Sequence, residues 1–246
     1  MKLSIITVVR NNVAEIGETM ASVLDAQPGV ELEYIVIDGA STDGTVEKIL
    51  ERRSELAYFV SEPDHGIYQA MNKGIRRAAG DVIGMINAGD RYFPGALKLV
   101  ADAFADPARL DHTVFWGDAE YSRLGRVRGF RPSNLSRGAF ALHPTMFVPR
   151  RVYDRVGLYD ESFRLLGDYD WMYRAVHRHG VEPLYCPELI AYYREGGISD
   201  RHIAACLRDE LRVKIRHGAP AGPARILFAL KIIKNLPRIV LAKMIK

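Results

Sequence analysis

The first half of the chain alternates short apolar runs with stretches in which apolar residues recur at helical spacing. The run from Leu3 to Val9 is rich in β-branched residues, which is typical of a buried strand. Apolar residues from Val13 to Leu24 then follow a helical period, and Pro28-Gly29 ends the predicted helix. The alternation continues with predicted strands at 34–37, 56–60 and 82–86 and with predicted helices after Asp43 and at 67–79. This order predicts an α/β fold with a mainly parallel central sheet and helices on both faces.

The second half has a more mixed pattern. Helices are predicted at 95–104, 169–179 and 203–216, and strands are predicted at 113–117, 126–130, 145–148, 184–185 and 190–193. No internal repeat or long linker divides the chain. We therefore expect one α/β domain over residues 1–222 and a basic amphipathic helical segment over 223–246, broken or kinked at Pro237.

Composition places the chain among ordinary soluble globular proteins. It has 246 residues, of which 48% are hydrophobic and 26% charged, and this excludes a mainly disordered or collagen-like chain. Cys186 and Cys206 lie far apart and form no CxxC pair, which argues against a zinc cluster or a disulfide framework. The N-terminal apolar run is too short for a signal peptide, and no run is long enough to span a membrane. These features predict a cytoplasmic protein.

The net charge of +4 is a property of the C-terminal segment. No acidic residue occurs from Ala224 onward, whereas six basic residues do: Arg225, Lys231, Lys234, Arg238, Lys243 and Lys246. A general nucleic-acid-binding surface is therefore not indicated, and we expect no nucleic-acid partner. A basic amphipathic helix is typical of peripheral contact with an anionic membrane. The alternative is a terminal helix that packs on the domain and leaves its lysines in water.

Polar residues gather where the predicted strands end. Asp38 and Asp90 end two strands, Asp64 lies in the loop after a third, and Arg10-Asn11 follow the first. The carboxyl ends of parallel strands meet at one edge of a sheet, where ligands bind. Carboxylates gathered there repel one another unless a cation or hydrogen-bond donors lie between them. The simpler interpretation is that Asp and Asn favour turns.

Two common phosphate-binding motifs are absent from the sequence. No GxGxxG follows the first strand and no GxxxxGK[ST] occurs, which argues against a dinucleotide-binding domain and a P-loop enzyme. Phosphate binding at this edge would need a metal ion or a basic side chain instead.

Four phrases, in order and at plausible spacing, resemble family 2 glycosyltransferases of the GT-A fold. They are SIITVVRNN, IVIDGASTDGT, SEPDHGIYQAMNKGIRRAAGDVIGMINAGD and GDYDWMYR. The resemblance extends from Lys2 to Ser199. The PDHGIYQAMNKG stretch is similar to bacterial members that build exopolysaccharide or capsule repeat units.

The resemblance implies roles for particular residues. Asp90 matches the end of the family's metal-binding segment for Mg²⁺ or Mn²⁺, and Asp168 matches the catalytic base. The donor-binding residues would be Thr7, Arg10, Asn11 and Asp38 for the base and ribose, and Asp64 and Lys73 near the ribose and diphosphate.

The chain departs from the family's pattern at three glycines. Gly39, Gly89 and Gly167 stand where many members have an acidic residue, and Asn87 replaces the first aspartate of the metal-binding segment. One carboxylate at Asp90 can still hold a divalent cation when the donor's diphosphate supplies the other ligands.

The expected activity is inverting transfer of a sugar from a nucleotide-diphospho-sugar, with UDP as the expected nucleotide. The acceptor is a hydroxyl of a glycan or lipid-linked molecule, in bacterial surface polysaccharide synthesis at the inner face of the membrane. A divalent cation would stabilise the leaving diphosphate, and Asp168 would accept the hydroxyl proton. Asp168 is also suited to cap the predicted helix that follows it.

Two alternative functions remain open from the sequence. A nucleotidyltransferase shares acidic metal sites, but TVVRNNVAEIG lacks the glycine-rich basic loop expected after the first strand. A non-catalytic sugar- or lipid-binding module of the same fold is favoured by Asn87, Gly89 and Gly167 and opposed by Asp38, Asp90 and Asp168.

Overall fold

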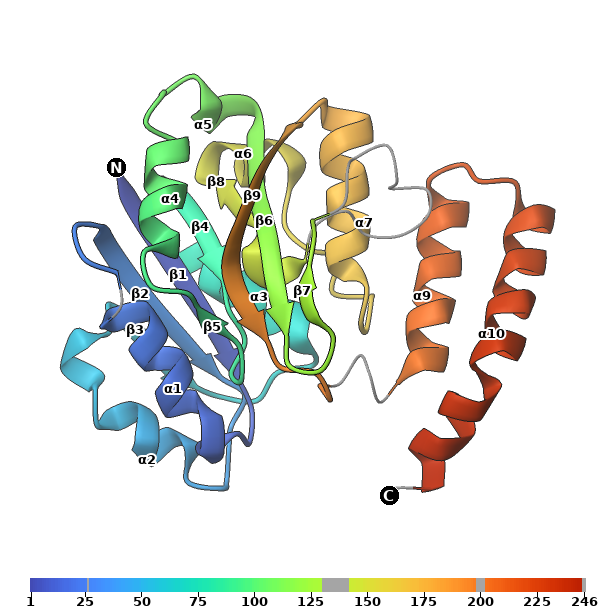
Figure 1. Cartoon of the computed structure of the whole chain (residues 1–246), viewed down its shortest axis with the longest axis horizontal. Helices are drawn as coiled ribbons and strands as arrows, with labels where there is room; N and C mark the ends of the chain where they lie inside the picture. Colours follow the sequence, from blue (N-terminus) through green and yellow to red (C-terminus); the bar gives the residue numbers. More distant parts are fainter. Residues whose placement is uncertain (26, 130–141, 198–201, 245–246) are drawn as a thin grey trace.

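The structure is a computed structural model that describes residues 1–25, 27–129, 142–197 and 202–244 (Figure 1). In the first half, strands and helices alternate: β1 Lys2–Val9, α1 Val13–Leu24, β2 Glu31–Asp38, α2 Thr45–Leu50, a 3-10 turn Arg53–Glu55, β3 Tyr58–Ser61, α3 Ile67–Arg77 and β4 Val82–Met85. The predicted order of strands and helices is confirmed over this half.

The second half adds short strands, helices and a helical pair at the C-terminus. The elements are β5 Arg91–Tyr92, α4 Ala96–Ala103, α5 Arg109–His112, β6 Thr113–Tyr121, β7 Gly125–Val127, η3 His143–Thr145, β8 Phe147–Pro149, α6 Arg150–Val156, α7 Gly167–Tyr173, the π turn η4 Arg174–Arg178, β9 Glu182–Tyr193, α9 Ile203–Arg216 and α10 Ala221–Met244.

One sheet runs through the molecule in the order β3-β2-β1-β4-β8-β6-β9-β5, with β7 paired to β6. The first four strands are parallel, so their carboxyl ends lie on one edge. Strand β8 runs antiparallel to β4 and β6, whereas β9 is parallel to β6 and β5 antiparallel to β9. The parallel sheet predicted from the sequence is the N-terminal half of this larger, mixed sheet.

Helices cover both faces of the sheet because both faces of its central strands are apolar. Along β1, Leu3 and Ile5 face one core, and Ile6 and Val8 face the other. Residues of α1, α2 and α4 fill the first core, and residues of α3, α6 and α7 fill the second (Figure 1). This double burial explains why the strands appear in the sequence as continuous apolar runs rather than alternating ones.

Some predicted boundaries differ from the structure. The two strands predicted at 184–185 and 190–193 form the single strand β9, whose pairing with β6 shifts register around Gly117 and Asp118. The predicted strand at 126–130 is shortened to β7, and its last residue lies outside the described ranges. The predicted helix at 169–179 begins earlier, at Gly167, and changes to a π turn from Arg174.

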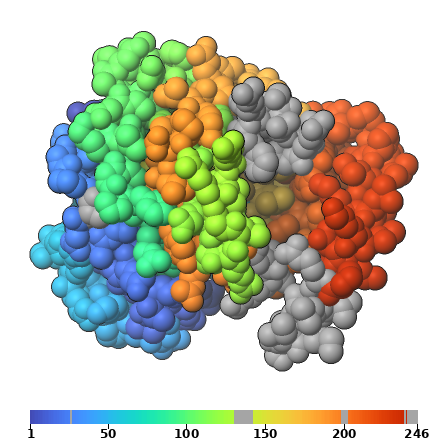
Figure 2. Space-filling view, viewed as in Figure 1, coloured from blue at the N-terminus to red at the C-terminus, as the bar shows by residue number. Residues whose placement is uncertain are grey.

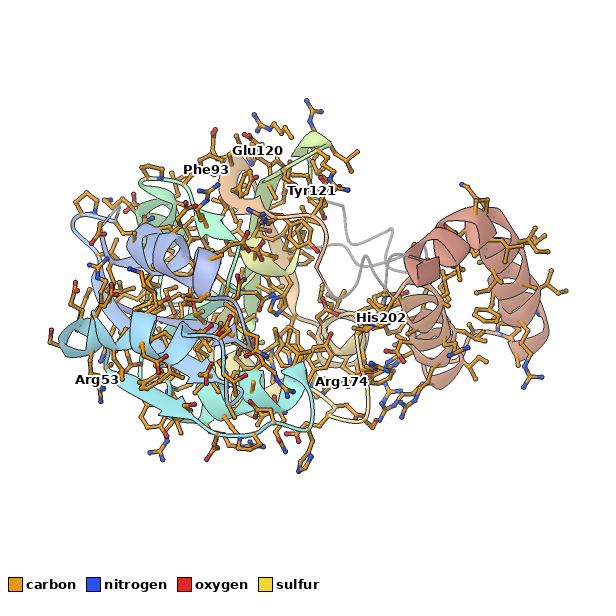
Figure 3. All side chains as sticks on the ribbon, turned by 90° about the horizontal axis from the view of Figure 1, so that it is seen from below. Arg53, Phe93, Glu120, Tyr121, Arg174 and His202 are labelled. Atoms are coloured by element: carbon orange, nitrogen blue, oxygen red, sulfur yellow. The ribbon has the colours of Figure 1, made fainter. Side chains whose placement is uncertain are left out.

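Helices α9 and α10 form a pair beside the sheet, and α10 lies on the side of α9 away from it (Figure 1). Seen from below in Figure 3, the pair stands to one side of the body, with His202 at the start of α9 facing that body. A buried carboxylate links the pair to α7, because Asp170 accepts a hydrogen bond from Arg174 and lies 3.0 Å from Nε2 of His217. Pro237 lies inside α10, so of the two predicted effects, a break or a kink, the break does not occur.

Across the described residues, we find no helix that combines the length and apolar character needed to span a bilayer.

Candidate functional site

The loop that follows β2 is built around the carboxylate of Asp38. This side chain is fully buried, and its Oδ2 accepts hydrogen bonds from the Ser41 backbone N–H (2.9 Å) and the Ser61 hydroxyl (2.6 Å). Its Oδ1 accepts one from the Ser41 hydroxyl at 2.5 Å. Asn11 braces the same loop, because its Oδ1 accepts a hydrogen bond from the Thr42 backbone N–H at 2.9 Å. Asp38 and Asn11 therefore hold the shape of the edge.

The structure places Thr7 away from this edge. It is fully buried, and its hydroxyl lies 2.9 Å from the hydroxyl of Tyr34, on the side of the sheet covered by α1. The residue of β1 beside Asp38 is Val9, whose carbonyl accepts a hydrogen bond from the Gly39 N–H at 2.9 Å. Arg10, the residue directly after β1, lies at the edge and is exposed.

Arg10 and Asp64 lie against Gly39. Carbon atoms of Arg10 and Oδ2 of Asp64 are each 3.5 Å from the place that a Cβ on Gly39 would take. Asp64 is mostly buried, and its Oδ1 lies 2.6 Å from Nζ of Lys73. Within the described part of the chain, its Oδ2 has no hydrogen-bond partner. A buried carboxylate oxygen without a donor is costly, so this atom is suited to accept a hydrogen bond from a ligand.

Lys73 belongs to the same cluster, which thus joins α3 to the β2 edge. Its Nζ lies 2.7 Å from Glu62 and 2.6 Å from Asp64. Partial desolvation lowers the pKa of Lys73, but the hydrogen bonds and charges of Asp64 and Glu62 outweigh it, so the pKa is raised. The side chain stays cationic and fixes the position of the Asp64 carboxylate.

The turn after β4 carries a second acidic cluster. Asp90 is 4% exposed, and its Oδ1 accepts a hydrogen bond from the Arg194 backbone N–H at 2.9 Å. Burial raises the pKa of Asp90 to about 7; the Arg194 N–H opposes the shift, and the charge of Glu15 adds to it. Asn87, in the same turn, has a buried Oδ1 with no partner among the described residues.

Glu15 supplies a carboxylate that the sequence interpretation missed. Its Oε2 lies 2.7 Å from the place that a Cβ on Gly89 would occupy. Asn12 donates a hydrogen bond to this Oε2 at 3.1 Å, and Arg194 pairs with Oε1 at 2.5 Å. The signal in the sequence was Gly89 itself, because a glycine in a polar turn leaves room for a side chain from another element.

The oxygen atoms around this turn fit a hard divalent cation. Mg²⁺ and Mn²⁺ prefer carboxylate and carbonyl oxygens, and Asp90, Glu15 and Asn87 present such atoms. The described residues contain no cluster of three or more His, Cys, Asp or Glu side chains suited to hold a metal ion. A cation bound here would therefore need further ligands from a bound molecule.

Asp168 lies in the first turn of α7, where it is partly buried. It is the second residue of the helix rather than its cap, and its Oδ1 accepts the Tyr169 N–H at 2.9 Å and the Tyr68 hydroxyl at 3.1 Å. No hydrogen bond to its Oδ2 is found in the described residues. Because Tyr68 is in the first turn of α3, it ties Asp168 to the same edge of the sheet as Asp64.

The side chains of Trp171 and His143 make structural contacts. Trp171 is fully buried and donates a hydrogen bond from Nε1 to the Gly157 carbonyl at 2.7 Å. Nε2 of His143 lies 3.2 Å from the Tyr159 hydroxyl. Burial lowers the pKa of His143, and the charge of Asp168 opposes that shift. These contacts favour structural roles for both.

A cavity lies elsewhere, beside β7. It has a volume of about 450 Å³ and contains none of the predicted site residues; its lining is Asp118, Arg126, Arg128, Gly129, Tyr185 and Pro187. The buried Asp118 carboxylate is already bonded to Tyr185, Gly129 and Arg126. The acidic clusters, rather than this cavity, coincide with the strand ends.

Comparison with known proteins decides the family. The sequence model of Glycosyl transferase family 2 matches residues 4–157. The chain belongs to this family. The match includes Asp38, Asp64 and Asp90 and ends before Asp168.

Curated relatives of this family-2 glycosyltransferase occur in mycobacteria. An uncharacterized glycosyltransferase of Mycobacterium tuberculosis (strain H37Rv) is 30% identical over 178 residues, which cover 70% of this chain and 68% of that protein. A PGL/p-HBAD biosynthesis glycosyltransferase of Mycobacterium bovis (strain BCG) is 25% identical over 241 residues, covering 95% of this chain and 91% of the relative. These relatives and the family match identify the chain as a transferase enzyme.

Solved structures confirm the GT-A fold. Staphylococcus aureus TarS 1-349 in complex with UDP aligns with a TM-score of 0.66 at 18% identity, covering 96% of this chain and 72% of that one. Mannosyltransferase PcManGT from Pyrobaculum calidifontis, in complex with GDP-Man and Mn²⁺, aligns with a TM-score of 0.67 at 18% identity over 98% of this chain and 73% of that one.

The raised pKa of Asp90 predicts a pH-dependent effect of its removal. Between pH 3.8 and about 7, Asp90 is protonated in the native state and ionised in the unfolded state. The free energy of unfolding therefore falls as the pH rises through this range. Asp90→Asn keeps an oxygen for the Arg194 N–H and abolishes this fall. We expect the variant to gain roughly 2 kcal/mol relative to wild type between pH 5 and pH 8.

Urea unfolding in EDTA at both pH values measures this difference. Asp102→Asn is the control, because Asp102 is an exposed partner of Lys98. A difference between Asp90→Asn and wild type that stays constant with pH would contradict the assignment.

Proposed function

We propose that the protein is an inverting glycosyltransferase that moves a sugar from a nucleotide-diphospho-sugar to a hydroxyl of a glycan or lipid-linked acceptor. The expected donor is a UDP-sugar, and the expected setting is bacterial surface polysaccharide synthesis. One observation supports this most: Asp168 lies at the edge of the sheet with Oδ1 fixed and Oδ2 without a hydrogen bond in the described residues. A carboxylate held in this way is suited to accept a proton from a bound hydroxyl.

The donor would bind against the ends of β1 and β2. Arg10 and the unpartnered Oδ2 of Asp64 flank Gly39 and are suited to contact the base and ribose. Lys73 positions Asp64 and adds positive charge for the phosphates, whereas Asn11 and Asp38 keep the loop in place. Thr7 contributes through its bond to Tyr34 inside the core rather than by contact with the donor.

Asp90 and Glu15 would hold the divalent cation, Mg²⁺ or Mn²⁺, together with oxygens of the donor's diphosphate. When bound, the cation neutralises charge that develops on the leaving diphosphate. The buried Asp90 and its neighbour Glu15 repel each other, and this repulsion favours a cation between donor and protein.

Asp168 would act as the general base. As the bond between the acceptor oxygen and the anomeric carbon forms, the bond from that carbon to the diphosphate oxygen breaks. The hydroxyl proton passes to Oδ2 of Asp168, and the electron pair of the broken bond leaves with the diphosphate. Attack from the face opposite the leaving group inverts the anomeric centre.

The family match and the relatives' names give no support to a nucleotidyltransferase or a non-catalytic module.

Asp168→Asn tests the base directly. The amide keeps the shape of the side chain and can still accept the Tyr68 hydroxyl, but it cannot take a proton. We expect transfer to fall by roughly 10²–10⁴-fold, while donor binding stays within about twofold. Asp154→Asn removes an exposed carboxylate from α6 and should leave both unchanged. Near-normal turnover of Asp168→Asn would remove this residue as the base.

We propose further that the enzyme is peripheral at the inner face of the membrane and makes contact through α10. The face of α10 turned away from α9 carries large exposed side chains, with Ile226 64%, Leu230 59% and Ile233 67% exposed. On a helical period, Arg225 and Lys234 lie on either side of this stripe. Figure 2 shows α10 along the outer side of the molecule.

The charge of this region favours an anionic lipid surface over another protein face. No acidic residue follows Glu210 in the chain. Glu210 itself is neutralised by Lys214 at 2.6 Å and Lys231 at 2.5 Å, a pairing that also fixes α10 on α9. An apolar stripe between basic residues is the pattern of helices that lie in a membrane interface.

Replacing Ile226, Leu230 and Ile233 together by Gln tests this contact. Sedimentation with vesicles that contain phosphatidylglycerol should fall at least roughly tenfold, because the lost apolar burial exceeds 1.4 kcal/mol. Leu124→Gln, at the exposed turn between β6 and β7, is the control. Unchanged sedimentation would contradict the proposal, as would a dimer in solution that the triple variant dissolves.

A further inference from the structure

Tyr68 of α3 contacts both Gly167 and Asp168 of α7. Its ring packs directly on Gly167: a Cβ there would lie 2.9 Å from Cε2 of the ring and 3.0 Å from Cδ2 and Cζ. The side chain is 4% exposed and also contacts the ring of Tyr159. Its hydroxyl reaches two acceptors, the Leu165 carbonyl at 2.6 Å and Oδ1 of Asp168 at 3.1 Å.

We propose that Tyr68 is the positioning residue for Asp168, and that its single hydroxyl proton is shared between Asp168 and the Leu165 carbonyl according to the charge on Asp168. This inference rests on the proposed role of Asp168 as base. With Asp168 ionised, the hydroxyl donates to Oδ1, fixes the carboxylate and leaves Oδ2 turned to the acceptor. Once Oδ2 has taken the acceptor's proton, Oδ1 is a weaker acceptor and the hydroxyl bonds to Leu165 alone.

The tyrosine keeps its own proton throughout. Burial, together with the negative charge of Asp168, raises the pKa of Tyr68 well above its usual value. The proton that leaves the acceptor hydroxyl therefore ends on Asp168, and Tyr68 only changes the oxygen to which it donates. No bond other than the acceptor O–H and the sugar–diphosphate bond is broken.

The arrangement also accounts for Gly167. A side chain at this position would overlap the Tyr68 ring, since contacts below 3.0 Å are not tolerated. Gly167 thus leaves room for the ring of Tyr68 from α3. The Tyr68 hydroxyl then donates to Asp168, a contact that Gly167, which has no side chain, cannot make. The Asn72 amide bonds to the Tyr159 carbonyl at 2.9 Å and so fastens α3 close by, which keeps the Tyr68 ring in place.

Other ionisable groups face Asp168 besides Tyr68. The charge of Asp168 reaches His143 from η3 and Tyr159 from the loop before α7. Burial lowers the pKa of His143, and its contribution must be separated from that of Asp168 in a pH profile.

Tyr68→Phe tests the proposal, because it keeps the ring against Gly167 and removes the hydroxyl. We expect kcat to fall roughly 10–100-fold, the loss typical of a hydrogen bond to a charged group, with KM for the donor unchanged. Without its donor, Asp168 is a stronger base, so the acid limb of the profile of kcat/KM against pH should move to higher pH. The same shift should appear in a His143→Asn background.

Tyr153→Phe is the matched control. Tyr153 is equally buried in this aromatic cluster and bonds to the Tyr159 hydroxyl at 3.1 Å, without contact to Asp168. Tyr153→Phe should lower the stability of the protein but leave the acid limb of the profile of kcat/KM against pH unchanged. If Asp168→Asn is inactive while Tyr68→Phe shows wild-type kcat and pH profile, the positioning role is overturned. If Asp168→Asn is active, the proposed base fails instead.

Discussion

The parallel pairing of β1 with β2 determines the position of everything else at the site. Because both faces of these strands are buried, their register is fixed, and it sets Val9 beside Asp38 where the two strands end. The Asp38 carboxylate then satisfies the N–H and hydroxyl groups of the next turn, and the Gly39 N–H bonds back to Val9. Arg10 and Asp64 are placed on either side of Gly39 as a result. If the pairing of a strand shifted by one residue, each of its apolar side chains would face the opposite helical layer.

Three glycines at this edge lie against side chains from other elements. Gly39, Gly89 and Gly167 stand where the resemblance led us to expect acidic side chains. A Cβ at these positions would lie 3.5 Å from Oδ2 of Asp64 at Gly39, 2.7 Å from Oε2 of Glu15 at Gly89, and 2.9 Å from a ring carbon of Tyr68 at Gly167. The chain thus keeps oxygen atoms at the edge while changing the elements that supply them.

The sequence predicted the fold well where local periodicity decides it. Parallel strands, the two helical layers and the approach of Asp38, Asp64 and Asp90 to one edge follow from apolar runs that end in polar turns. Thr7 shows the limit, because a strand residue two positions from the end faces the core rather than the edge. Glu15 and Tyr68 lie far along the chain from the glycines that they contact, so no spacing rule finds them. Pro237 does not break the C-terminal helix, because α10 continues through it.

We propose that the edge formed by β1, β2 and β4 binds a nucleotide diphosphate together with a divalent cation. Calorimetric titration of UDP and of GDP, each with and without Mn²⁺, tests it most directly. We expect binding that depends on Mn²⁺ and that is lost in Asp90→Ala, with UDP preferred. The same pattern with GDP alone would keep the enzyme class and change the donor. If neither nucleotide binds to the folded protein in the presence of Mn²⁺, this edge is not a nucleotide-diphosphate site.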